Sequence, residues 1–152
     1  MYGKYLGSNI GYKLDTYSLT NIYLTSLIKQ ILVGLLLGDG NIRKPTPNSN
    51  PQIQYNQGFV HLNHMLIMFF LLSSIVTHLP SLVQRRDLTV YLHLDTRCLA
   101  CLIPLYELFI VEGKKRIPVT ISNWLTPVSL AFWAMDDGSS TPAYAIGVKD
   151  FI

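Results

Sequence analysis

The chain has 152 residues, of which 49% are apolar and only 14% are charged, and its formal net charge is +3. This length fits one domain, or one domain and part of another, and so much apolar content argues against a disordered chain. Two cysteines exclude a disulfide scaffold and a four-cysteine zinc site. The most apolar run, residues 65–76, is much shorter than the ~20 residues of a membrane span, so no membrane partner is expected.

The first part of the chain has no clear pattern, and a helical pattern follows it. Residues 1–19 lack an apolar period, so we expect a loose arm. Apolar residues recur every three or four positions over residues 24–36, which predicts a helix. We expect Gly40 to end this helix in the left-handed conformation that often follows a last turn. Beyond a loop rich in proline and asparagine, residues 52–57 alternate polar and apolar, which predicts a strand.

The middle of the chain predicts a second helix, a hairpin and a third helix. Residues 61–78 are apolar almost throughout, and Pro80 is expected to close the helix that they form. Residues 88–94 alternate as a strand, and residues 81–85 are expected to pair with it. Residues 98–111 predict the third helix. The strand face that we expect to be buried consists of Leu88, Val90, Leu92 and Leu94.

A last helix is expected near the end of the chain. Thr126 has the side chain of an N-cap and Pro127 suits the first helical position. The helix is expected to end at Asp136, Asp137 and Gly138, and residues 141–148 could form one more strand. The order helix, two strands, helix, two strands, helix and one more helix predicts an α+β domain.

The polar faces of the predicted strands carry hydrogen-bonding side chains with few charges. Such a face suits the edges of bases in a nucleic-acid groove, because Gln and Asn can pair bidentately with adenine. An ordinary solvated sheet face is the alternative interpretation. The side chains in question are those of Gln52, Gln54, Asn56, Thr89, Tyr91 and His93.

Two of the helices end in the same way, because Asp39 and Asp137 each directly precede a glycine. An acid at a helix C-terminus is disfavoured by about 0.3–1 kcal/mol, so its double use suggests a function for the charge. If the helices pack side by side, which Gly34 and Gly38 would allow, the carboxylates and free carbonyl groups converge. Such oxygen ligands suit Mg²⁺. The alternative is a pair of ordinary Asp-Gly turns.

These two helix ends, residues 32–40 and 130–138, resemble the paired motifs of the LAGLIDADG homing endonucleases. The stretch Thr-Pro-Val-Ser-Leu-Ala-Phe-Trp, which leads into the second motif, is similar to the mitochondrial intron-encoded subfamily. Residues 108–111 and the Lys-Lys-Arg-Ile-Pro segment at 114–118 are similar to the same subfamily. Two motifs, the order of elements between them and this basic segment together carry the resemblance.

The resemblance covers roughly residues 20–140 and implies a fold. A LAGLIDADG half-domain has the order αββαββα with an antiparallel four-stranded sheet, and we expect it over residues 20–124. Residues 1–19 would form an N-terminal arm. Residues 125–152 would hold the second motif helix and a short tail of an incomplete second domain.

The resemblance also implies an activity, the hydrolysis of one phosphodiester bond on each strand of double-stranded DNA. The family's metal-binding acids occupy the eighth motif position, here Asp39 and Asp137, and the implied cofactor is Mg²⁺ or another divalent cation. Asp136 is then expected to be structural or to support the metal-binding residues without binding the metal itself. Lys115 matches a basic residue near the family's active site, and Gln57 falls where a polar active-site side chain is often found. Phosphate contacts are expected from Arg43, Lys44, Arg85, Arg86, Lys114 and Arg116.

Only 14 residues follow Gly138, whereas a single-chain family member with two motifs has a second half-domain there. Three interpretations stay open. A second polypeptide, or self-association, supplies the missing half; or the chain is a degenerate endonuclease; or it is reused as an RNA-binding protein, such as an intron maturase or an organellar ribosome component that binds structured RNA. The subfamily implies a mitochondrial location.

Overall fold

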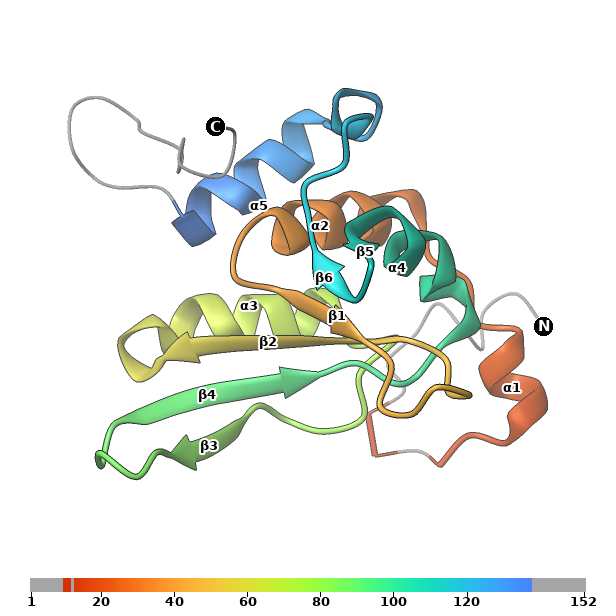
Figure 1. Cartoon of the computed structure of the whole chain (residues 1–152). Coiled ribbons are helices and arrows are strands. Elements are labelled where there is room, and N and C mark those ends of the chain that lie inside the picture. Colours follow the sequence, from red (N-terminus) through yellow and green to blue (C-terminus); the bar gives the residue numbers. More distant parts are fainter. Residues whose placement is uncertain (1–9, 12, 138–152) are drawn as a thin grey trace. The chain divides into compact units, whose positions relative to one another are not determined.

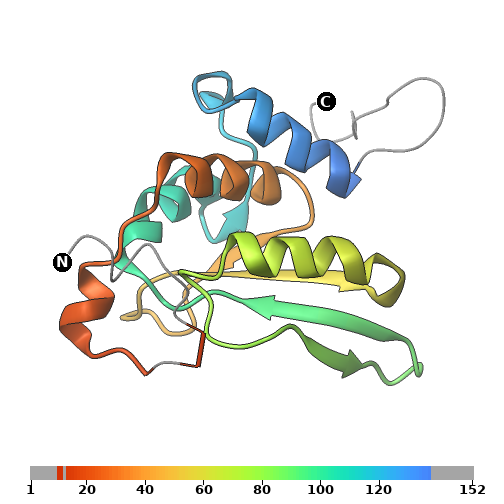
Figure 2. The same cartoon turned by 180° about the vertical axis from the view of Figure 1, so that it is seen from behind.

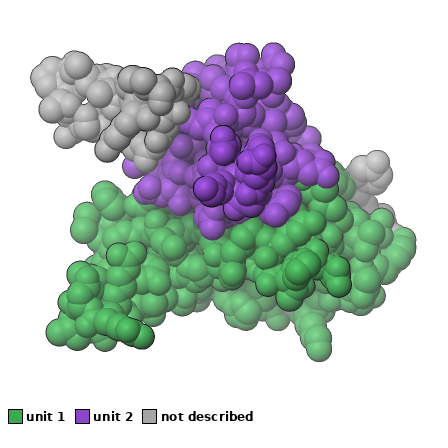
Figure 3. Space-filling model, viewed as in Figure 1, with its two compact units in different colours: residues 1–23, 43–103 green, residues 24–42, 104–152 purple. Residues whose placement is uncertain are grey.

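The computed structural model describes residues 10, 11 and 13–137, with the backbone alone of Asp137 (Figures 1 and 2). The chain divides into two compact units (Figure 3). The first, here called the sheet unit, comprises residues 1–23 and 43–103. The second, here called the helix unit, comprises residues 24–42 and 104–152. Each unit is therefore assembled from two separate stretches of the sequence.

A four-stranded sheet dominates the sheet unit, with the strand order β1-β2-β4-β3. β4 is the antiparallel partner of both β2 and β3, so that His93 lies opposite Asn56 on one side and Ser81 on the other. This arrangement confirms the predicted α+β class and its antiparallel sheet. The elements are α1 (Thr16–Thr20), β1 (Asn41–Arg43, of which only Arg43 belongs to this unit), β2 (Gln52–Gly58), α3 (Leu62–Leu71), β3 (Ser81–Gln84) and β4 (Val90–Asp95).

The core of the sheet unit lies between α3 and one face of the sheet (Figure 1). Alternate residues of β2 and β4 are buried, as the sequence alternation predicts, and α3 presents its own buried stripe. Full burial of one such side chain stabilises the fold by ~1.5–3 kcal/mol. The buried side chains are Ile53, Tyr55, Met65, Met68, Phe69, Leu92 and Leu94.

The helix unit contains the two motif helices, α2 and α5. Thr25 caps α2 by accepting a hydrogen bond from the backbone N–H of Ile28 at 3.2 Å. A short hairpin turns at Gly113, which has the positive φ of 74° that favours glycine. The elements are α2 (Ser26–Leu37), α4 (Ile103–Phe109), β5 (Ile110–Val111), β6 (Lys114–Lys115) and α5 (Pro127–Asp137).

The helix expected over residues 61–78 is shorter than predicted, because α3 ends at Leu71. Two serines and then Ile, Val and Thr follow it, and these residue types are poor helix formers. Instead, Val76 forms an isolated antiparallel bridge with Thr96, and Ile75 O accepts a hydrogen bond from Arg97 N at 2.8 Å. Of the helices in the described part of the chain, none combines the length and apolarity that crossing a bilayer requires.

Four other expectations are corrected. Part of the expected loose arm is helical, because Asp15 caps α1 by accepting from Ser18 N at 2.8 Å. Leu88 and Val90 were expected to be buried, but they are 75% and 43% exposed. Leu88 belongs to the turn, where its φ is 69°. The third helix covers only Ile103–Phe109, after a 3₁₀ turn. Finally, the basic segment expected as a loop contributes β6. The strand considered for residues 141–148 lies outside the described residues.

Candidate functional site

The two motif helices, α2 and α5, pack directly against each other in the helix unit (Figure 1). At Gly34 an added Cβ would run into the backbone carbonyl oxygen of Ser129 and would lie 3.0 Å from the Cβ of Phe132. At Gly38 it would collide with the carboxylate of Asp136. Both glycines therefore permit the close helix approach that their spacing predicts.

The start of α5 is fixed by reciprocal hydrogen bonds between Thr126 and Ser129. Thr126 Oγ1 accepts from Ser129 N at 3.1 Å, which confirms the predicted N-cap. Ser129 Oγ in turn accepts from Thr126 N at 2.7 Å and donates to Thr126 O at 2.9 Å. Because Ser129 is also the residue that Gly34 packs against, the cap fixes α5 at the point of closest helix approach.

The carboxyl ends of the two helices are joined by a hydrogen bond between the motifs. Asp136 Oδ2 accepts from the backbone N–H of Asp39, which directly follows Gly38, the C-cap of α2. The contact gives Asp136 a structural role, because its carboxylate holds the backbone of the first motif. The sequence shows two adjacent acids at 136 and 137, but this pattern alone does not predict the contact.

Lys115 binds the same loop from β6. Its ammonium group donates to Gly38 O at 2.8 Å and to Gly40 O at 2.6 Å, the carbonyl groups on either side of Asp39. A cation here complements the partial negative charge of the α2 C-terminus. Asp39 itself is exposed, so its carboxylate stands at the surface, beside a positive charge that is held at a fixed place.

Asp137 is the last residue of α5, and its side chain lies outside the described part of the chain. Among the side chains that the structure describes, which do not include that of Asp137, no group of three or more His, Cys, Asp or Glu could hold a metal ion. The oxygen atoms around Asp39 belong to carboxylate and carbonyl groups, which is the donor chemistry that Mg²⁺ prefers, and the Lys115 ammonium already donates to two of the carbonyl oxygens. The chemical types of these oxygen donors therefore suit a hard cation.

Gln57 belongs to the sheet unit and lies on the buried side of β2, after Ile53 and Tyr55. It is only 9% exposed. The opposite side of the sheet carries the polar residues that the alternation singled out, Gln52, Gln54, Asn56, Tyr91 and His93, all of them exposed or half-buried. Thr89 lies in the turn before β4 instead.

The basic residues predicted to meet phosphates are all exposed: Arg43, Lys44, Arg85, Arg86, Lys114 and Arg116. In the sheet unit, the guanidinium of Arg85 lies over the Tyr91 ring, 4.9 Å from its centroid, which orders a long side chain beside the polar face. In the same hairpin, hydrogen bonds from the Thr89 side chain and backbone lower the pKa of the Asp87 carboxyl.

Comparison with known proteins places this geometry in a family. The profile of the LAGLIDADG DNA endonuclease family matches residues 29–149. Two relatives are named cytochrome b mRNA maturase bI2. The one from Saccharomyces cerevisiae is 30% identical over 124 residues, which cover 73% of this chain and 29% of the relative. The one from Debaryomyces hansenii is 25% identical over 116 residues, which cover 72% of this chain and 44% of the relative.

A third relative, the probable intron-encoded endonuclease 1 of Wickerhamomyces canadensis, is 26% identical over 126 residues, which are 76% of this chain and 51% of the relative. Among solved structures, the homing endonuclease I-WcaI bound to its DNA recognition sequence superposes with a TM-score of 0.67 at 25% identity. That match covers 80% of this chain and 55% of the other.

The chain thus spans between 29% and 51% of the length of these three relatives. The family profile nevertheless includes both motif ends, which are the ends that the hydrogen bond between Asp39 and Asp136 joins. The chain belongs to the LAGLIDADG DNA endonuclease family.

Proposed function

We propose that this chain is the catalytic part of a site-specific DNA endonuclease that hydrolyses one phosphodiester bond on each strand of a duplex. The observation that carries the proposal is the hydrogen bond from the Asp39 backbone to Asp136, next to Asp137 in the second motif. It brings an acid of each motif to one place. The similarity to a probable intron-encoded endonuclease and to a homing endonuclease bound to its DNA recognition sequence supports the same activity.

In this proposal Asp39 and Asp137 hold a divalent cation, Mg²⁺ in the simplest case. A cation bound there would lower the pKa of the attacking water and stabilise the negative charge that develops on the phosphoryl and leaving oxygens. Lys115 adds a fixed positive charge beside Asp39, where it attracts the scissile phosphate, and its bonds to Gly38 O and Gly40 O hold the loop that carries Asp39. Asp136 keeps the two motif ends in register. Gln57 is the least supported member of the proposed site.

Recognition of the duplex is assigned to the sheet unit. The polar face of β2 and β4 would meet base edges, while the exposed arginines and lysines would neutralise phosphates and so position the duplex. With a formal net charge of only +3, nonspecific attraction is modest, and base contacts carry a large share of the selectivity.

A complete binding surface for a long duplex site needs a second half, since this chain spans about half or less of its relatives. We propose that a partner polypeptide or a second copy of the chain supplies it. The relatives named as intron-encoded and as cytochrome b maturases are consistent with a mitochondrial location for this chain.

RNA binding is the second candidate function, because two relatives are named mRNA maturases. In that case the polar sheet face and exposed basic residues would bind structured intron RNA, and the acids would have no catalytic task. The two functions differ in their need for a divalent cation.

The experiment is a cleavage assay with the purified chain on a plasmid that carries the intronless insertion locus, with Mg²⁺ or with EDTA. Asp137→Asn removes one proposed metal-binding charge at constant size, and Glu107→Gln removes an exposed charge on α4 as the matched control. We expect Mg²⁺-dependent cuts that only Asp137→Asn abolishes. Absence of cuts together with tight binding of the intron RNA would replace the endonuclease with the maturase-like function.

A further inference from the structure

Helix α3 is apolar on its outer side as well as on the side that packs against the sheet. Residues 65–72 are all apolar, whereas a helix at the surface of a protein normally has a polar outer face. At a helical period of 3.6 residues, Ile67 and Phe70 lie on the side of α3 away from its buried stripe. They are 54% and 69% exposed.

The exposed apolar side chains continue into the 3₁₀ turn Phe59–His61, which directly precedes α3. There Phe59 is 51% and Val60 is 85% exposed. Residues three and four positions apart are neighbours on a helix surface, so these side chains form one continuous strip. It is here called the α3 row, and its members are Phe59, Val60, Asn63, Ile67 and Phe70.

The size of the α3 row fits a weak protein interface. An aromatic side chain can bury about 150–250 Å², so the apolar members at their observed exposures offer roughly 400–500 Å². The largest apolar patch on a typical monomer has about 300–600 Å² and often has a function. Two such surfaces in contact would bury about 1,000 Å² or less in total, which is the size of a transient interface.

The charge distribution selects the kind of partner. No Asp, Glu, Lys or Arg occurs between residues 45 and 84, a stretch that includes all of α3. Nucleic acid is unsuited to this surface, because binding of phosphates needs cations. A helix that lies on a lipid surface carries Lys and Arg beside its apolar face, and α3 has neither. An apolar and uncharged protein surface is the partner that fits.

A second copy of the chain supplies such a surface. Val60, Asn63, Ile67 and Phe70 are spaced by three, four and three residues, which is the spacing of a seam between two helices. Asn63 is the one polar member of the α3 row, and its amide group has both donors and an acceptor, so it can pair with its own counterpart. A single asparagine in such a seam fixes the register of the two helices.

We infer that the α3 row is a homodimer interface in which the α3 helices of two copies pack in parallel across a two-fold axis, with the two Asn63 side chains opposite each other. The ring of Phe70 is already supported within each copy, because its centroid lies 5.4 Å from that of the buried Phe69. Little of its side-chain order would therefore have to be gained on association.

This dimer leaves the polar face of the sheet free, because α3 covers the opposite face (Figures 1 and 2). Each dimer would therefore present two polar faces, one from each copy. The interface lies in the sheet unit, whereas the motif helices α2 and α5 belong to the helix unit. The dimer does not depend on the proposed endonuclease activity, and its absence would leave that proposal standing.

The test is sedimentation equilibrium of the full chain without DNA over about 5–500 μM, because an interface below the standard size gives a Kd of about 1 μM or weaker. Ile67→Glu places a charge in the α3 row. Val119→Glu makes the same change at a side chain of the helix unit that is 99% exposed, and it is the matched control. We expect the wild type and Val119→Glu to dimerise alike, and Ile67→Glu to raise the Kd at least about tenfold, because like charges then face each other.

Three results would overturn the inference. The wild type stays monomeric over the whole range; or all three proteins dimerise equally, which would assign the dimer to another surface; or a monomeric wild type binds phosphatidylcholine vesicles, which would assign the α3 row to a lipid surface. Because glutamate is a good helix former and Ile67 is exposed, we expect Ile67→Glu to keep its fold, and circular dichroism checks this.

A second measurement tests the register without adding a charge. Asn63→Cys and Asn48→Cys each replace an exposed asparagine of the sheet unit, and each retains the native Cys98 and Cys101. Under mild oxidation we expect Asn63→Cys to form a covalent dimer at least about fivefold faster than Asn48→Cys, because a disulfide needs Cβ atoms about 3.5–4.5 Å apart. Equal rates would mean that the two α3 helices do not face each other in this register, and they would overturn the inference.

Discussion

The Asp136 carboxylate accepts a hydrogen bond from the backbone N–H of Asp39, a residue 97 positions earlier in the chain. An acid in the last turn of a helix opposes the helix dipole, which costs about 0.3–1 kcal/mol in the absence of a partner. A hydrogen bond between a charged acceptor and a backbone amide contributes about 1.5–3 kcal/mol, enough to offset that cost. The unfavourable placement that is visible in the sequence is therefore compensated by the contact that joins the two motifs.

Replacement of Asp136 by Ala removes this link and leaves Asp39 and Asp137 in the sequence. We expect cleavage to fall by roughly 10–100-fold, the usual effect of losing a residue that orients a metal ligand. The Mg²⁺ concentration for half-maximal cleavage should rise as well. Asp136→Asn keeps an acceptor oxygen and should lose less cleavage activity than Asp136→Ala. Equal activity of Asp136→Ala and the wild type over a full Mg²⁺ titration would contradict this role.

The packing of α2 against α5 depends on Gly34, where a methyl group would meet the backbone carbonyl of Ser129. Backbone cannot move aside as a flexible side chain can, so Gly34→Ala should destabilise the protein by about 1–3 kcal/mol. For a chain of this size we expect a fall in Tm of roughly 3–10 °C.

The matched control for that substitution is Gly58→Ala. An added Cβ at Gly58 meets nothing within 4 Å, and its φ of −59° is open to any residue. Its Tm should stay within about 2 °C of the wild type or rise slightly, because alanine restricts the unfolded chain more than glycine does. A similar loss in both variants would mean that the helix contact is not the cause.

Lys114 and Lys115 are neighbours in β6 with different expected roles. Lys115 holds two carbonyl groups beside Asp39, so Lys115→Met should lower the cleavage rate at saturating DNA. Lys114 is an exposed phosphate contact in our proposal, so Lys114→Met should instead weaken DNA binding and reduce the salt dependence of log K by about 1. Single-turnover rates and a salt titration of binding separate the two. The assignment fails if both variants change only the affinity.

Elements with a strong local pattern were predictable from the sequence. The period of α2, the alternation of β2 and the cap at Thr126 each depend on residues that are close in the chain, and the structure contains all three. The convergence of the motif ends was also predictable, because Gly34 and Gly38 share a helix face with room for a second helix.

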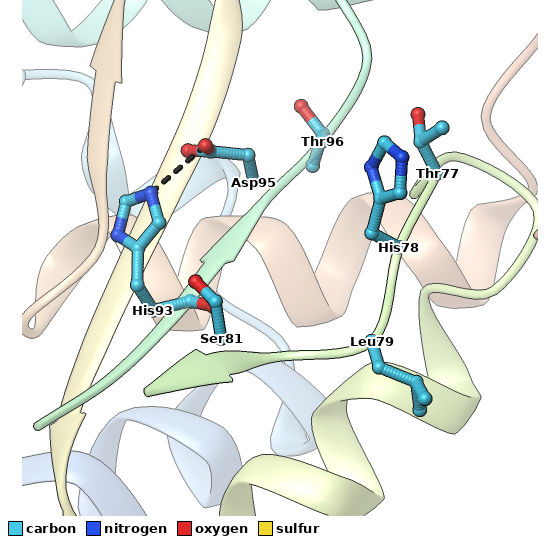
Figure 4. A pocket seen from close by; sticks show the side chains of 7 residues that line it. All are labelled: Thr77, His78, Leu79, Ser81, His93, Asp95 and Thr96. Carbon is cyan, nitrogen blue, oxygen red and sulfur yellow. Dashed lines mark hydrogen bonds and ion pairs between the residues drawn. The ribbon is translucent and has the colours of Figure 1, made fainter. Parts of the chain in front are cut away.

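Other features depend on contacts that the local sequence does not contain. Gly40 was expected to adopt a left-handed conformation, but among the described glycines only Gly11 and Gly113 have a positive φ. A Cβ at Gly40 would instead approach Leu35 O to 2.7 Å, so close packing requires glycine there. Asp95 continues the alternation of Tyr91 and His93, but the local sequence does not predict the pocket that it lines together with residues 77–79 and 81 of the neighbouring segment (Figure 4).

His64 on α3 gives the sheet unit a dependence on pH. Burial, and secondly the charge of nearby His61, lower the pKa of His64 below its ordinary value of 6.5. The unfolded chain therefore takes up this proton more readily than the folded chain. Stability is highest above the unfolded pKa, falls as the pH drops through about 6.5, and levels off below the folded pKa.

We expect His64→Gln to reduce the difference in Tm between about pH 8 and pH 5.5, because it removes a group that the unfolded state protonates preferentially. Loss of the edge contact between the His64 and Tyr55 rings should lower the Tm at both values of pH. His61→Gln removes only the smaller of the two causes that lower the pKa of His64, so it should reduce the pH-dependent difference in Tm less. Thermal unfolding followed by circular dichroism measures all three proteins, and an unchanged pH dependence in His64→Gln would assign the acid sensitivity to another group.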